Sequence, residues 1–105
     1  METRDRVTER LLALSQDMLA AAHGQQWEAL AAAQHARDAL LRAAFAGPVA
    51  EQEAEPVAAC ILELQRLDRE LLALIEAGRE DIARQLRELR GGREGAETYR
   101  RFSGR

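Results

Sequence analysis

Apolar side chains recur every three or four residues along three long stretches of this chain, and glycine- and proline-containing breaks separate the stretches. This spacing places side chains on one face of an α-helix, whereas a half-buried strand would alternate apolar and polar residues. The 105 residues include 21 alanines and 15 leucines, but only three valines, three isoleucines and three threonines. A sheet needs β-branched and aromatic residues for its pleated faces. The sequence therefore predicts an all-α protein.

The first two stretches predict a helical hairpin. One helix is expected over about residues 3–23, with Thr3 as its N-cap and Gly24 as a C-terminal cap in the left-handed region. The second is expected over about residues 26–45. Because only two or three residues connect them, we expect the two helices to pack antiparallel.

The third stretch predicts a longer helix over about residues 56–90, with Pro56 in its first turn and Gly91-Gly92 as the stop. An earlier start at Pro48, with a kink at Pro56, is the alternative. The expected architecture is an antiparallel bundle of three main helices, formed by residues 1–92. Residues 93–105 then form a flexible tail or a short fourth helix.

The third helix would be longer than the hairpin that packs against it. At 1.5 Å per residue it spans about 50 Å, against about 30 Å for each of the other two. Some of the residues Ile82, Leu86 and Leu89 are therefore expected to meet the tail, a second copy of the chain or another protein. The sequence leaves open whether the chain is a monomer, is a homodimer or exchanges helices with a second copy.

Charge and composition exclude several classes of function. The formal net charge is −3, from 18 acidic residues against 15 arginines, and duplex binding requires a protein to neutralise phosphates. Direct nucleic-acid binding is not expected. The sequence contains no run of 18 apolar residues, so no membrane span is predicted. A single cysteine, Cys60, and a charged N-terminal stretch, METRDRVTER, favour a reducing, cytoplasmic location.

No catalytic or metal-binding motif accompanies this helical pattern. The sequence lacks a phosphate-binding glycine loop, a nucleophile elbow, an HExxH pair and a CxxC pair. His23 and His35 lie on different predicted helices, and neither has a cysteine or carboxylate at ligand spacing. Cys60 is interpreted as a small buried side chain. We therefore expect no enzymatic activity, no cofactor and no metal.

Two residues have both a structural and a functional interpretation. Asp68 interrupts the apolar stripe of the third helix, where its side chain can turn to water or pair with Arg69 or with an arginine of the second helix. Alternatively, it is a polar specificity element in a helix–helix interface. Trp27, the largest apolar side chain, is interpreted as a core anchor, with client binding as the alternative.

The order of these features resembles the family of flagellar export chaperones called FliT. The shared features begin with an apolar first helix, LLALSQDMLAAA, and a short turn before Trp27. They continue with an Arg-Asp pair at Arg37 and the run CILELQRLDRELLALI around Asp68. Tyr99, after a glycine-containing segment, matches the family's C-terminal end. The resemblance covers about residues 7–99.

The resemblance implies a cytoplasmic chaperone that holds the filament-cap protein FliD unassembled before secretion. It also implies contacts with the export ATPase complex and, in some bacteria, with the transcription activator FlhDC. A non-chaperone scaffold that homo-oligomerises through the same apolar stripe is the alternative function.

The wide apolar face of the third helix is expected to bind the client, with an aromatic residue of the tail as part of a movable cover. The expected partner-binding residues are Ile61, Leu64, Asp68, Leu71, Leu72, Ile75 and Tyr99.

Overall fold

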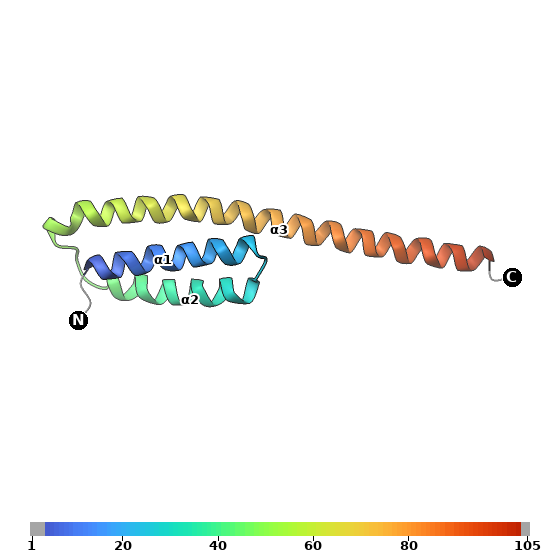
Figure 1. The fold of residues 1–105 in the computed structure, drawn as a ribbon, viewed down its shortest axis with the longest axis horizontal. Coiled ribbons are helices and arrows are strands. Elements are labelled where there is room, and N and C mark those ends of the chain that lie inside the picture. The colour runs from blue at the N-terminus through green and yellow to red at the C-terminus, as the bar shows by residue number, and fades with distance from the viewer. Residues whose placement is uncertain (1–3, 104–105) are drawn as a thin grey trace. The chain divides into compact units, whose positions relative to one another are not determined.

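The computed structural model describes residues 4–103, with side chains placed for residues 4–92. It contains α1 (Arg4–His23), α2 (Trp27–Ala44), the short 3-10 helix η1 (Glu51–Glu53) and α3 (Ala54–Ser103) (Figure 1). The described residues contain no strand. The all-α prediction is confirmed, and Thr3, the expected N-cap of the first helix, lies outside the described residues.

The chain divides into two compact units, residues 1–75 and residues 76–105, and α3 contributes to both. The first unit contains α1, α2, η1 and the first part of α3. The described part of the second unit consists of the remainder of α3. The expected separation of residues 93–105 from a bundle of residues 1–92 stays a prediction.

A tight turn joins α1 to α2 and makes them an antiparallel hairpin (Figure 1). The Gln26 N–H donates to the Ala21 carbonyl over 2.8 Å, and the Gln25 N–H donates to the Ala22 carbonyl over 3.1 Å. These two bonds form a Schellman motif, which requires a left-handed residue after the helix. That residue is Gln25, with φ 55°, and no described glycine has a positive φ. The expectation that Gly24 would adopt this conformation is therefore wrong.

The core of the first unit lies between α1 and its two neighbours. One buried cluster combines leucines and a methionine of all three helices, and Trp27 packs against it, partly buried. The core interpretation of Trp27 is confirmed. The residues of this first cluster are Met18, Leu19, Ala22, Leu30, Leu67 and Leu71. A second cluster consists of Leu11, Cys60 and Leu64.

Arg4 connects the start of α1 to the C-terminal end of α2 and to η1. Its Nε donates to Glu53 Oε2 over 2.8 Å, and its Nη1 donates to the Ala44 carbonyl. Its guanidinium also lies 5.5 Å from the centroid of the Phe45 ring, within cation–π range. One side chain thus joins α1, the end of α2 and η1.

The third helix differs from its predicted bounds at both ends. It begins at Ala54, so Pro56 is its third residue; proline is tolerated there because the first N–H groups of a helix have no intrahelical partner. It also continues through Gly91 and Gly92 to Ser103, which corrects the expected stop at about Arg90. Two helical glycines cost only about 2 kcal/mol in propensity, which is too little to end a helix alone.

Candidate functional site

A groove of about 210 Å³ opens on the surface of the first unit. Its floor is apolar and its polar groups come from one carboxylate, one carboxamide and one guanidinium. All three helices contribute to it: α1 supplies one residue, α2 two and α3 four. The lining residues are Met18, Gln34, Arg37, Asp68, Leu71, Leu72 and Ile75.

Arg37 is the polar centre of this groove. It lies on the α2 face that points into the bundle, and it is only 9% exposed. Its Nη1 donates to Asp68 Oδ1 on α3 over 2.6 Å and to Ser15 Oγ on α1 over 3.1 Å. One side chain therefore connects the three helices. The interpretation in which Asp68 pairs with an arginine of the second helix is confirmed.

The two partners differ in their access to water. The Asp68 side chain is 43% exposed, whereas the Arg37 side chain is 11% exposed. Arg37 Nε is buried and has no hydrogen-bond partner among the described residues. A buried donor without an acceptor is costly, so the guanidinium depends on Asp68 and Ser15 for its compensation. The outer side of Asp68 can meet a ligand without breaking the contact.

This arrangement offers both apolar and polar contacts to a binding partner. Above the buried Met18, Leu72 and Ile75 can contact an apolar side chain, and Gln34 and Asp68 at the edge can contact polar groups. Among the described residues, no group of three His, Cys, Asp or Glu side chains could hold a metal ion. An amphipathic segment of another protein has the matching chemistry.

Four of the seven partner-binding residues expected from the sequence line this groove: Asp68, Leu71, Leu72 and Ile75. Of these, Leu72 is 60% exposed, whereas Leu71 is buried in the core.

The other three expected residues lie elsewhere. Leu64 is buried beside Leu11 and Cys60, and Ile61 is exposed on α3 away from the groove lining. Tyr99 belongs to α3, but its side chain lies outside the described part of the structure.

Sequence reasoning missed three groove residues, Met18, Gln34 and Arg37, as contributors to a site. A signal for Arg37 was present, because it interrupts the stripe formed by Trp27, Leu30 and Leu41. Asp68 interrupts the facing stripe with the opposite charge. Two opposite charges that each break an apolar stripe are candidates for a pair, since a buried charge needs a partner.

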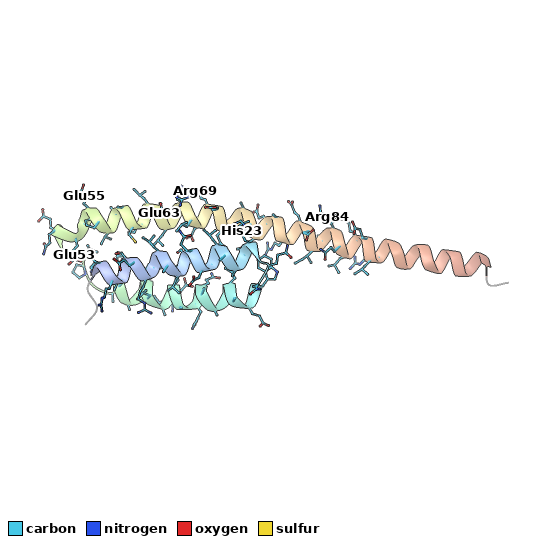
Figure 2. All side chains as sticks on the ribbon, in the orientation of Figure 1. His23, Glu53, Glu55, Glu63, Arg69 and Arg84 are labelled. Atoms are coloured by element: carbon cyan, nitrogen blue, oxygen red, sulfur yellow. The ribbon has the colours of Figure 1, made fainter. Side chains whose placement is uncertain are left out.

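Other charged groups of α3 form local surface pairs. Arg66 hydrogen-bonds to Glu63, whose position on α3 is labelled in Figure 2, at distances from 2.7 to 3.2 Å. This hydrogen bonding lowers the pKa of the Glu63 carboxyl. Both residues are exposed or half-buried, so the pair lies on the surface and does not contribute to the groove. Desolvation by burial raises the pKa of the Cys60 thiol, which opposes a role as a nucleophile.

The family model described as flagellar protein FliT matches residues 6–101. No curated protein and no solved structure matches the chain. Within the described part of the chain, no helix is both long and apolar enough to cross a membrane.

Proposed function

Because this chain belongs to the FliT family of flagellar proteins, we propose that it binds the filament-cap protein FliD and delivers it to the flagellar export apparatus. Family membership implies a flagellar export chaperone role. The proposed location is the cytoplasm, where the client is made. The proposed activity is binding alone, without catalysis or a cofactor.

The observation that supports this proposal most directly is the groove around Arg37 and Asp68. A helical client segment could lay its apolar face along α3, with one anchor side chain against Leu72 and Ile75. Leu72 is 60% exposed in the free protein. Covering it would remove apolar surface from water, which favours association by about 25 cal/mol per Å².

The polar edge of the groove would orient the client. Asp68 accepts from Arg37 through Oδ1, so its second oxygen can accept from a donor on the client. The carboxamide of Gln34 offers both a donor and an acceptor. The buried residues Leu64 and Leu71 would act beneath this surface by holding α3 against α1.

The proposed mechanism requires no nucleotide. A chaperone that covers an amphipathic segment of its client lowers the concentration of that segment available for premature assembly, by mass action. Handover follows when the export ATPase complex binds the chaperone or its client more tightly. Any effect on transcription would come through binding of FlhDC and not through DNA.

Titration calorimetry of the full-length chain with a FliD C-terminal peptide tests the proposal. We expect saturable binding with one site per chain, whereas an unrelated amphipathic peptide of the same length should give no saturation. If FliD shows no saturable binding, the chaperone proposal is wrong. A homo-oligomeric scaffold would then be the better interpretation.

A further inference from the structure

The groove of the first unit presents negative charge to the solvent. Two of its lining residues are ionised, Arg37 and Asp68, and they differ in their access to water. The Arg37 side chain is 11% exposed and donates to Asp68 Oδ1 over 2.6 Å, whereas the Asp68 side chain is 43% exposed. A partner that enters the groove therefore meets the carboxylate of Asp68 and little of the guanidinium.

The contact with Arg37 also fixes the position of this carboxylate. Arg37 is itself held by a second hydrogen bond, in which its Nη1 donates to Ser15 Oγ on α1 over 3.1 Å. A carboxylate that is positioned before binding loses less side-chain entropy when it pairs with a partner. Asp68 is therefore a preorganised acceptor for a donor that arrives from outside the bundle.

An exposed apolar contact lies one helical turn from the Asp68 carboxylate. Leu72 follows Asp68 by four residues on α3, is 60% exposed and lines the same groove. Side chains four residues apart on a helix are neighbours, at roughly 5–6 Å between Cβ atoms. A client helix that lies along α3 presents its own side chains at the same interval. The groove thus offers an anionic and an apolar contact at the spacing of one helical turn.

Given that the chain binds a helical client as proposed above, we propose that this groove selects client segments in which a lysine or arginine lies four residues from an apolar anchor. The cation pairs with the outer side of Asp68, and the anchor covers Leu72 and Ile75. An acidic client residue at the same place would face the carboxylate, and like charges in an interface are unfavourable. Asp68 therefore determines specificity, since any amphipathic helix can supply the apolar contact.

The competing arrangement is an acidic client side chain that displaces Asp68 and takes its place on Arg37. Arg37 is only 9% exposed, so this exchange has to break the 2.6 Å contact before the new one forms. The two arrangements predict opposite effects of removing the Asp68 charge. Asp68→Asn should weaken the binding of a basic client segment, whereas it should strengthen the binding of an acidic one.

Two synthetic amphipathic peptides of identical composition separate these possibilities. The first has a central leucine, lysines four residues before and after it, and glutamates two residues before and after it, on the other side of the helix. The second exchanges the lysines and the glutamates. Because the lysines flank the leucine on both sides, the test does not depend on the direction in which the peptide lies. Acetylated and amidated ends remove the terminal charges.

Fluorescence titration of the labelled peptides with the full-length protein measures the preference. We expect the first peptide to bind about fivefold to tenfold more tightly, because a modest ion pair replaces a repulsion. Asp68→Asn should abolish most of this preference. Glu63→Gln is the matched control, since it removes a carboxylate of the same helix that does not line the groove. This variant should keep the preference, and circular dichroism should show that both variants stay helical.

Equal affinity of the two peptides, a preference for the second peptide, or a preference that survives Asp68→Asn would overturn the proposal. Failure of both peptides to bind would overturn it as well. The FliD C-terminal peptide distinguishes this failure from failure of the chaperone function. Saturable FliD binding that is equal for the parent and Asp68→Asn contradicts the cation preference and leaves the chaperone function standing. A lysine preference without FliD binding contradicts the chaperone function alone.

Discussion

Arg37 on α2 donates to Asp68 on α3 over 2.6 Å, at the point where each residue interrupts the apolar stripe of its own helix. The same Nη1 also donates to Ser15 on α1. The contact is asymmetric, because water reaches much of Asp68 but little of Arg37. Loss of the carboxylate would leave a nearly buried charge without its main partner.

Asp68→Ala should therefore destabilise the protein by about 1–3 kcal/mol, the range for leaving a buried donor without its hydrogen-bond partner. Partial exposure keeps the cost below that of a fully buried pair. Arg37→Met should cost less than Asp68→Ala, because an unpaired Asp68 can be hydrated. Urea unfolding of both variants and of the double variant gives the coupling between the two residues. The prediction is wrong if Arg37→Met is the more damaging change.

Glu63→Ala is the matched control for this comparison. It removes an ion pair of similar length, Glu63 to Arg66 at 2.7 Å, from the exposed surface of the same helix. Surface ion pairs contribute little, so the thermal midpoint of this variant should fall far less than that of Asp68→Ala.

The left-handed conformation of Gln25 predicts a stabilising substitution. A residue with a Cβ is strained at φ 55° by roughly 1 kcal/mol, and glycine is not. Gln25→Gly should therefore raise the thermal midpoint by a few degrees, because the turn keeps its two backbone hydrogen bonds.

Gly24→Ala is the control for Gln25→Gly. Gly24 has no positive φ, and a Cβ there would make only ordinary contacts, the nearest with Gln26 Cγ at 3.5 Å. This substitution should be tolerated. If Gly24→Ala unfolds the protein while Gln25→Gly has no effect, the left-handed residue of the turn is Gly24 after all.

Burial of Cys60 predicts how stability depends on pH. Desolvation raises the pKa of its thiol above the ordinary value of 9.0, so the unfolded chain releases this proton at a lower pH than the folded protein does. The stabilising contribution is complete below the ordinary pKa and is lost as the pH rises above it. Cys60→Ala should remove this alkaline loss. Unfolding curves of the two proteins at neutral and alkaline pH measure the difference.

Alkylation provides an independent check on Cys60. The folded protein should react slowly with iodoacetamide at pH 8, and urea should accelerate the reaction strongly, because the thiolate is the reactive form. A native rate equal to the unfolded rate would show that the thiol is exposed.

The helices were predictable because their signals are local. Apolar spacing, the turn at Gly24 and the break after Phe45 give α1 and α2 to within one residue of their observed bounds in the described part. The C-terminal end of α3 was not predictable from Gly91 and Gly92, since glycine lowers helix propensity without forbidding a helix. Whether two glycines end a helix depends on what packs around them. At Gly91 and Gly92 an added Cβ would meet nothing within 4 Å, so no packing contact there requires α3 to end.

The groove was only half predictable, for a related reason. The stripe of α3 contains Asp68, Leu71, Leu72 and Ile75, and the sequence indicated all four. Met18, Gln34 and Arg37 reach the same place from two other helices. Their convergence depends on the rotation of each helix about its axis, which spacing within one helix does not report. The same limit explains why Leu64 and Leu71, interpreted as partner-binding, are buried in the core.

Two exposed leucines of α3 test the proposed client site most directly. Leu72 is 60% exposed and lines the groove, whereas Leu62 is 66% exposed and does not. Titration calorimetry should compare Leu72→Asp and Leu62→Asp for binding to the FliD C-terminal peptide, with circular dichroism confirming that both stay helical. The account predicts that Leu72→Asp weakens binding by about tenfold or more, whereas Leu62→Asp binds like the parent. Equal affinity for both variants, or a loss confined to Leu62→Asp, would contradict a client site at the Arg37–Asp68 groove.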